Sequence, residues 1–179
     1  MVKKTIFFDK DKCIGCCACI IACKMKHNSP PHPTIPPQGE PTGMNLISVY
    51  HFGPAFSEDR VIQFFQPLSC MHCLDAPCIN VCPTNAIYAD SETGAVLVNQ
   101  KRCIGCKVCI WACPYGALHL DSKGRMEKCD MCIDRIKKGK LTACEATCVA
   151  RAIFVGTPEE VSQIQAKKAM AKIKDESPG

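Results

Sequence analysis

Seventeen cysteines occur among the 179 residues, and their spacing divides sixteen of them into four groups of four. Groups one and three are spaced C-x2-C-x2-C-x3-C, group two C-x2-C-x4-C-x3-C, and group four C-x2-C-x11-C-x3-C. In chain order the groups are Cys13, Cys16, Cys19 and Cys23; Cys70, Cys73, Cys78 and Cys82; Cys103, Cys106, Cys109 and Cys113; and Cys129, Cys132, Cys144 and Cys148. Cys17 is left over. Thiolates repeated at such short intervals are ligands for metals.

The spacing of groups one and three suits a cubane of four irons and four sulfurs. Three cysteines two residues apart wrap one face of the cubane, so that each thiolate binds one iron. The fourth cysteine opens a helix, points away and ligates a neighbouring cluster. Pro83 and Pro114 follow the last cysteine of groups two and three, where a turn is expected, whereas Lys24 follows Cys23. The pattern predicts [4Fe–4S] clusters.

Two other uses of cysteine compete with this prediction. Zinc also binds paired C-x2-C units, and group four taken alone fits zinc almost as well as iron. Its place in the series favours iron–sulfur, and a structural zinc module stays the alternative from a different class. A disulfide scaffold is disfavoured, because seventeen is odd and residues 1–12 hold only a three-residue apolar run, too short for a secretory signal.

Composition and charge agree with metal-bound thiols. Apolar residues make up 47% of the chain with cysteine included, but only about 37% without it, so bound metal is expected to supply folding energy. The formal net charge of +5 counts each cysteine as a neutral thiol. Four oxidised clusters of roughly −2 each would bring the net charge to about −3. We therefore read the basic residues as counter-charge and expect no nucleic-acid partner and no membrane span.

The segments between the groups predict an α+β fold with short hairpins and long loops. Residues 86–88 and 95–98 flank the turn 90–94, residues 117–120 and 125–127 flank the turn 121–124, and each hairpin follows a cysteine helix. That is the repeat of a two-cluster ferredoxin. Residues 61–126 are predicted to form one such dicluster module, inserted into a second module built from residues 1–60 plus 127–156.

Two further segments carry predictions. Residues 29–43 hold six of the thirteen prolines and predict a surface loop that contacts a partner or solvent. Residues 157–179 predict a C-terminal helix and tail. Thr157 is expected at the N-cap, Pro158 at the first helical position and Glu160 opposite the cap, with the helix running to about residue 173, either solvated or docked onto a partner.

With these motifs in place, the chain resembles the iron–sulfur electron-transfer subunits of dimethyl sulfoxide reductase-type molybdenum or tungsten enzymes. It is also similar to the polyferredoxin subunits of tungsten aldehyde oxidoreductases. The resemblance covers about residues 3–156 and includes the order of the groups, their spacings and the eleven-residue gap in group four. It implies four [4Fe–4S] clusters, because group three is complete.

The resemblance also implies crossed ligation, in which each cluster takes three cysteines from one group and one from another. Cluster 1 would be held by Cys13, Cys16, Cys19 and Cys148; cluster 2 by Cys23, Cys129, Cys132 and Cys144; cluster 3 by Cys70, Cys73, Cys78 and Cys113; and cluster 4 by Cys82, Cys103, Cys106 and Cys109. Cys17 is predicted not to be a ligand and to be a small buried side chain.

The expected function is one-electron transfer along the clusters, without catalysis by this chain. The partners implied are a molybdenum- or tungsten-cofactor catalytic subunit at one end and a flavin subunit, a membrane anchor or a ferredoxin at the other. A free polyferredoxin or a hydrogenase-associated electron carrier is the alternative. A cytoplasmic location is expected, with export alongside a signal-bearing partner as the other possibility.

Single residues outside the groups add little. None of the histidines, His27, His32, His51, His72 and His119, has a convincing set of co-ligands, so none is predicted to bind metal. Trp111 is expected to pack against its helix or a cluster. Four basic residues lie beside predicted ligands and would either raise cluster potentials or be ordinary solvated surface; these are Lys101, Arg102, Lys107 and Lys128.

Overall fold

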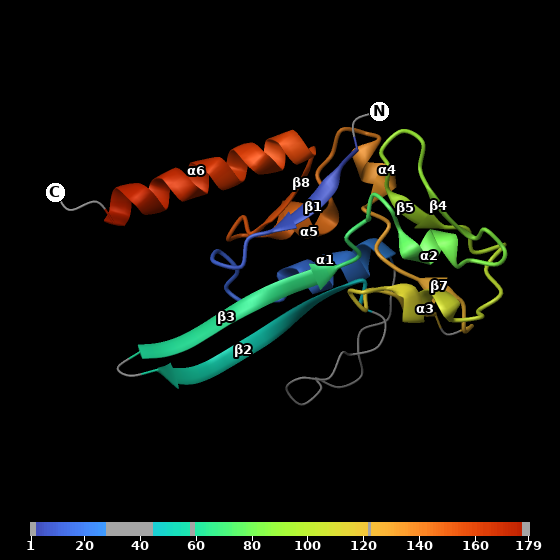
Figure 1. Cartoon of the computed structure of the whole chain (residues 1–179), viewed down its shortest axis with the longest axis horizontal. Coiled ribbons are helices and arrows are strands. Elements are labelled where there is room, and N and C mark those ends of the chain that lie inside the picture. Colours follow the sequence, from blue (N-terminus) through green and yellow to red (C-terminus); the bar gives the residue numbers. More distant parts are fainter. Residues whose placement is uncertain (1–2, 28–44, 58–59, 122, 177–179) are drawn as a thin grey trace.

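The computed structural model describes residues 3–27, 45–57, 60–121 and 123–176. The predicted proline-rich loop, residues 29–43, lies outside these ranges. The described chain forms short helices, one longer helix and four two-stranded antiparallel sheets (Figure 1). Among the described helices, none combines the length and the apolar character needed to cross a membrane.

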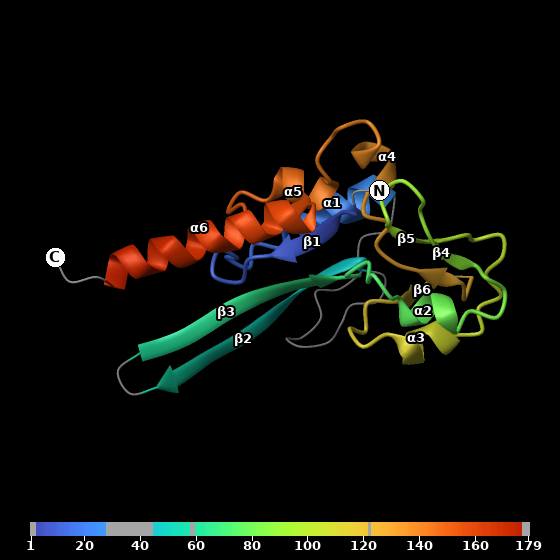
Figure 2. The ribbon, with the colours of Figure 1, turned by 45° about the horizontal axis from the view of Figure 1, so that its top comes forward.

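One half of the molecule is built from both ends of the described chain. Strand β1 (Thr5–Phe8) pairs antiparallel with β8 (Ile153–Gly156), and helix α1 (Ala18–His27) packs against α5 (Ala143–Thr147). The short helix α4 (Ile133–Ile136) belongs to the same half. Figure 2 shows these blue and orange segments side by side. We call this the terminal half, and it carries cysteine groups one and four.

The other half is continuous in sequence, and we call residues 70–127 the central half. Each of its two cysteine helices is followed by a hairpin, and both hairpins lie where the turn residues predicted them. The elements are α2 (Pro77–Asn80), β4 (Ile87–Ala89), β5 (Val96–Val98), α3 (Val108–Ala112), β6 (His119–Leu120) and β7 (Met126–Glu127). The Asp90 carboxylate organises the β4–β5 turn by accepting hydrogen bonds from the backbone N–H groups of Glu92 and Thr93.

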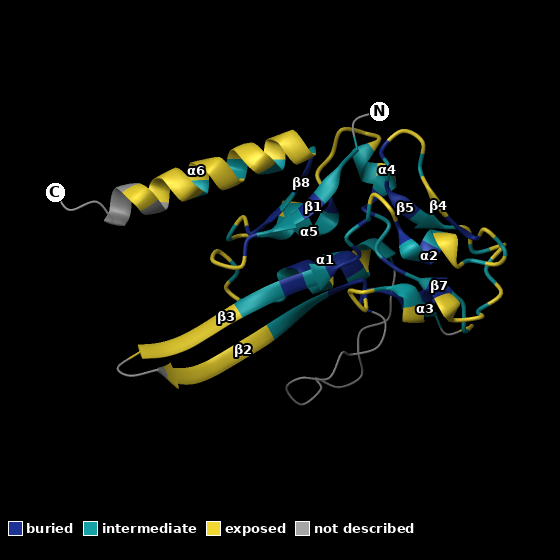
Figure 3. Ribbon diagram, viewed as in Figure 1, coloured by how far each residue is buried: buried dark blue, intermediate teal, exposed yellow. Residues whose placement is uncertain are grey.

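A long hairpin projects from the body and was not anticipated from the sequence. Strands β2 (Ile47–Ser57) and β3 (Arg60–Ser69) pair from Ile47 opposite Ser69 to the tip, with an irregularity between Phe52 and Ala55 (Figure 1). The hairpin is buried at its base and exposed towards its tip (Figure 3). It also spans residue 60, where the sequence places the boundary between modules.

Each half has its own buried core, and cysteine is part of both. The terminal core holds Ile6, Cys19, Cys23, Leu46, Ile47, Met131, Ile153 and Val155, together with Ala95 from the central half. The central core holds Ala76, Cys78, Ile87, Val96, Cys109, Leu118 and Met126. Among the described residues, 21 apolar residues are buried and six of these are cysteines, so the sulfurs occupy positions that aliphatic side chains would fill in an ordinary domain.

Polar contacts join the two halves. The Lys137 ammonium, just after α4, lies 3.2 Å from a carboxylate oxygen of Asp90 and 3.0 Å from one of Glu92, both in the β4–β5 turn. The backbone N–H of Lys4 donates to the Thr93 carbonyl at 3.1 Å. Because these contacts lie next to strands of both halves, they fix the halves against each other.

Helix α6 (Pro158–Glu176) begins at the predicted capping box. The backbone N–H of Thr157 donates to the Glu160 carboxylate at 2.8 Å, and the N–H of Glu160 donates to the Thr157 hydroxyl at 3.2 Å. The helix is largely exposed (Figure 3), and the Lys168 ammonium ties it to the body through Asp9 at 2.5 Å and Asp11 at 2.8 Å. The predicted helix is therefore confirmed, and it extends to residue 176.

These elements confirm an α+β fold of small sheets and short helices. The insertion of one dicluster module into the other stays a prediction.

Candidate iron–sulfur cluster sites

The C-x2-C-x2-C loops of groups one and three have the same backbone shape. Gly15 and Gly105 both have φ of +69°, and the residue two positions later, Cys17 or Lys107, is also left-handed, with φ of +57° or +66°. A Cβ on Gly105 would meet the Gly124 carbonyl oxygen at 2.4 Å, so glycine is required there. Both loops then enter a helix that carries the third cysteine of the group.

This equivalence explains the surplus cysteine. Cys17 occupies the position that Lys107 has in group three, and its Sγ donates to the Gly15 carbonyl at 3.3 Å within its own loop. Its side chain is half-buried rather than buried, which corrects that part of the prediction. Burial raises the pKa of the Cys17 thiol, and Cys16 and Cys13 raise it further.

Three hollows in the protein are lined by cysteines from two different groups. One hollow is lined by Cys82 of group two and by Cys103, Cys106 and Cys109 of group three. Another is lined by Cys23 of group one and by Cys129, Cys132 and Cys144 of group four. The third is lined by Cys13, Cys16 and Cys19 of group one, by Cys148 of group four, and by Cys17.

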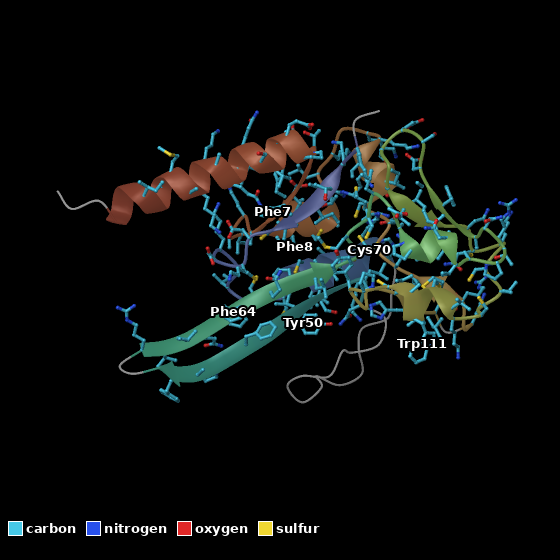
Figure 4. All side chains as sticks on the ribbon, viewed as in Figure 1. Phe7, Phe8, Tyr50, Phe64, Cys70 and Trp111 are labelled. Carbon is cyan, nitrogen blue, oxygen red and sulfur yellow. The ribbon has the colours of Figure 1, made fainter. Side chains whose placement is uncertain are left out.

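The remaining quartet is linked by electrostatic proximity. Burial raises the pKa of the Cys73 thiol, and Cys70 and then Cys113 add to the increase. Burial raises the pKa of Cys78 to about 11, and Cys70 and Cys113 again contribute. Cys113 of group three therefore lies near Cys73 and Cys78 of group two, and both of these also lie near Cys70. Figure 4 shows Cys70 in the body between the long hairpin and the central half.

Several buried thiols in these sites are poorly suited to be free thiolates. Burial raises the pKa of Cys19 to about 12 and that of Cys144 to about 11, and it raises the pKa of Cys129 well above its usual value. Thiols this basic keep their protons at neutral pH unless a cationic iron takes the place of the proton. Quartets of cysteines around these hollows fit a cysteine-bound cluster. The hollow of Cys23, Cys129, Cys132 and Cys144 is also lined by His27 and Asp130.

Backbone N–H groups point at several of the sulfurs. Ala86 donates to Cys82 and Ala152 donates to Cys148, each four residues on from the cysteine and each at 3.2 Å. Three other cysteines accept backbone N–H groups at 3.3 to 3.5 Å, namely Cys103, Cys129 and Cys132. Such donors stabilise negative charge on sulfur and orient the ligand, so they raise the potential of any cluster bound there.

The structure separates the four basic residues that lie beside predicted ligands. Lys101, Arg102 and Lys107 are exposed, as ordinary surface residues are. Lys128 is 5% exposed, and its ammonium donates to the carbonyls of Val96 and Cys129. Sequence position alone does not distinguish these residues, because burial of Lys128 depends on how the two halves meet.

Two histidines lie among the cysteines. His27 Nε2 is 3.3 Å from an Asp130 carboxylate oxygen, and this hydrogen bond raises the pKa of the imidazole to about 11, with Cys132 and Cys23 adding to the effect. His27, Asp130 and Cys132 bring possible metal-ligating atoms within 4.8 Å of one another, a grouping that sequence spacing did not suggest. His72 is 1% exposed, and its Nδ1 accepts the N–H of Val96 at 3.0 Å.

One single-residue prediction is wrong. Trp111 was expected to pack against its helix or a cluster, but its side chain is 90% exposed and points away from α3 (Figure 4). The short helix α3 turns this position outward because Cys109, two residues earlier, faces the hollow. His32 lies outside the described residues.

Comparison with known proteins agrees with this geometry. Residues 61–158 match the family model described as a 4Fe-4S dicluster domain. The protein belongs to the 4Fe-4S dicluster family. The match spans groups two, three and four and covers more than half of the chain. Within this family the chain is an iron–sulfur electron-transfer protein that binds [4Fe–4S] clusters, as its cysteine pattern predicts.

Relatives in this 4Fe-4S dicluster family are subunits of oxidoreductases. The chain is 40% identical to a sulfite dehydrogenase subunit of Allochromatium vinosum, covering 87% of the chain and 69% of the relative. It is 38% identical to the thiosulfate reductase electron transfer subunit PhsB of Salmonella typhi, covering 88% and 77%. It is 35% identical to one of the polypeptides of the anaerobic dimethyl sulfoxide reductase of Escherichia coli K12, covering 87% and 74%. The resemblance to subunits of the dimethyl sulfoxide reductase type is therefore confirmed.

A further relative is named for a hydrogenase operon. The chain is 33% identical to the hydrogenase-2 operon protein HybA of Escherichia coli O157:H7, covering 93% of the chain and 55% of that longer protein.

Proposed function

We propose that the chain carries four [4Fe–4S] clusters held by crossed ligation and conducts single electrons between two redox partners. Its proposed ligand sets are Cys13, Cys16, Cys19 and Cys148; Cys23, Cys129, Cys132 and Cys144; Cys70, Cys73, Cys78 and Cys113; and Cys82, Cys103, Cys106 and Cys109. The observation that carries the proposal is that each of three hollows is lined by three cysteines of one group and one of its partner group.

The same ligand sets support the two-module organisation. Clusters 3 and 4 use only groups two and three, which supports a module at residues 61–126. Clusters 1 and 2 use only groups one and four, and the pairing of β1 with β8 supports a module of residues 1–60 plus 127–156. The long hairpin β2–β3 then crosses from one module to the other at residue 60.

When bound, each cluster accepts and returns one electron. The residues of this chain bind the cluster and determine the polarity and hydrogen bonding around it. Four cysteines for each cubane occupy every iron, so no coordination position is left for a substrate, and we propose that the chain itself is not catalytic. Apolar side chains such as Ile87, Leu120 and Met126 line the hollow of cluster 4 and restrict water there, while the backbone N–H groups near the sulfurs favour the reduced form.

The relatives support a place in a molybdenum or tungsten enzyme. Their names describe subunits of sulfite dehydrogenase, thiosulfate reductase and dimethyl sulfoxide reductase. We propose a molybdenum- or tungsten-cofactor catalytic subunit as one partner of this chain. The second partner would be a flavin subunit, a membrane anchor or a ferredoxin. A cytoplasmic location stays a prediction from the sequence.

A role in hydrogen metabolism is the second candidate, because the chain is also similar to HybA. In that case, or as a free polyferredoxin, the clusters would be the same and the catalytic partner would differ.

Anoxic purification of the tagged chain from its natural host tests both levels of the proposal. The four-cluster account predicts about sixteen irons and as many acid-labile sulfides per chain. The partner account predicts a larger complex that contains molybdenum or tungsten. A complex with a hydrogenase instead would favour the second candidate, and a colourless, zinc-containing chain without iron would contradict both.

A further inference from the structure

Lys128 lies at the junction of the two halves of the molecule. It directly follows β7 of the central half and directly precedes Cys129 of the terminal half (Figure 1). Its side chain is nevertheless 5% exposed. Lysine is rarely buried to this degree, because its charge loses hydration inside the protein. A buried lysine therefore calls for a compensating interaction.

The protein partners of the Lys128 ammonium are neutral. It donates to the carbonyl of Val96 in β5 and, at 2.9 Å, to the carbonyl of Cys129. Among the described residues, no carboxylate forms an ion pair with it within 4.0 Å. Two carbonyl dipoles satisfy two donors but leave the full positive charge uncompensated, which is costly in a protein interior.

The side chain faces the ligand loops of two different clusters. Val96 accepts from Lys128 through its carbonyl and donates through its N–H to His72, which stands between Cys70 and Cys73. On the other side, the Cys129 carbonyl belongs to a ligand of cluster 2. Burial raises the pKa of both Cys78 and Cys129, and the charge of Lys128 acts against that increase at each of them.

We propose that Lys128 is a fixed buried cation shared by clusters 2 and 3. It stabilises added electrons on these two clusters and raises their reduction potentials above the values that their cysteines alone would give. The proposal rests on the ligand sets proposed above. Cysteine-bound cubanes have a net charge of about −2 when oxidised and −3 when reduced. They would supply the counter-charge that the described protein residues do not.

The step that this affects is electron transfer across the junction of the modules. Clusters held by the ligand sets that include Cys78 and Cys129 would exchange one electron, with no bond made and no proton moved. Because Lys128 lies beside the ligand loops of both clusters, its positive charge lowers the energy of an added electron on cluster 2 and on cluster 3. At an effective dielectric constant of about 20, removing a charge this close changes each reduction equilibrium by about tenfold, which is about 59 mV for one electron.

Redox titration of the anoxically purified chain, followed by electron paramagnetic resonance, tests the proposal. Lys128→Gln keeps a hydrogen-bond donor but removes the charge. In this variant, two of the four midpoint potentials should fall by about 59 mV, which is a tenfold change in the reduction equilibrium of each cluster. The other two should stay unchanged. Lys128→Arg should keep all four potentials near those of the unaltered chain. Lys101→Gln is the matched control, because Lys101 is exposed and lies two residues before Cys103.

Three results would overturn the proposal. These are four unchanged potentials in a fully loaded Lys128→Gln, an equal fall of all four, and an equal fall in Lys128→Arg. If Lys128→Gln does not bind its clusters, the test rests on Lys128→Arg. The proposal requires that this variant bind four clusters at the potentials of the unaltered chain. Failure of the proposed function has a different signature, since the unaltered chain itself would then lack four clusters.

Discussion

The terminal and central halves hold the same kind of site but are connected differently. In the central half, each cysteine helix is followed within a few residues by its own hairpin, so its structure is specified locally. In the terminal half, β1 needs β8 and α1 needs α5, and more than a hundred residues separate the partners. The same cysteine arrangement can therefore be built by local or by distant pairing. Because its partners are distant in sequence, the terminal half forms only when the two ends of the chain come together.

Removal of iron should have the largest effect and should separate the halves. Cysteines are part of both buried cores in the described part of the chain, so the protein without clusters should lose cooperative tertiary structure. Hydrogen exchange after anoxic chelation should show loss of protection in β1 and β8 before the local hairpin β4–β5. Protection retained in β1 and β8 of the iron-free chain would contradict this dependence.

Loss of the last cysteine of a group comes next. Cys23→Ala should disturb cluster 2, held by Cys129, Cys132 and Cys144, although Cys23 follows group one in sequence. Cys82→Ala is the matched change in the central half and should disturb cluster 4. Each variant should lose up to about four irons, measured by iron analysis and paramagnetic resonance. Loss of cluster 1 alone in Cys23→Ala would refute crossed ligation.

Truncation of one core isoleucine in each half gives a milder comparison. Ile153, 4% exposed in β8, and Ile87, 2% exposed in β4, are the matched pair. Each change to alanine should destabilise its half by about 2–5 kcal/mol through loss of contacts and the cavity that remains. On warming, Ile153→Ala should lose clusters 1 and 2 first, and Ile87→Ala should lose clusters 3 and 4 first. The same order of cluster loss in both variants would show that the halves are not separate units.

The contact between the halves at Lys137 should have a smaller effect. Lys137→Ala removes the ion pairs with Asp90 and Glu92 at an exposed position. All clusters should remain, while hydrogen exchange in the β4–β5 turn becomes faster. The difference from the unaltered chain should shrink as salt is added, because exposed charges are screened. An effect that is independent of salt would point to packing rather than charge.

Replacement of Cys17 should have the smallest effect. Cys17→Ala removes one hydrogen bond to Gly15 within the loop and should leave all four clusters in place. Iron content and redox titration check this, with Cys16→Ala as the control that should lose iron. Loss of iron in Cys17→Ala would mean that Cys17 is a ligand and that its equivalence with Lys107 is misleading.

Much of the central half could be predicted because its signals are local. Cysteine spacing and turn residues such as Asp90 act within a few residues. The capping box of Thr157 and Glu160, which starts helix α6 outside the central half, is equally local. The long hairpin β2–β3 was missed because Gly53 and Pro54 interrupt its alternation and read as a turn, yet the structure continues the strand past them.

Other features depend on contacts between distant segments. Burial of Lys128 against Val96 arises only where the two halves meet. The approach of His27 to Asp130 arises only where the distant segments of the terminal half come together, and no spacing in the sequence encodes either contact. The outward direction of Trp111 follows from the short helix α3, whose Cys109 faces a cluster hollow. Residue types alone identified the chemistry, whereas tertiary contacts decide which charges act on it.

Anomalous scattering at the iron edge, recorded from crystals of the anoxically purified chain, tests the central claim most directly. The account predicts four iron–sulfur clusters, with Cys23 bound to the one that also carries Cys129, Cys132 and Cys144. Fewer than four clusters, or Cys23 on the same cluster as Cys13, Cys16 and Cys19, would contradict it.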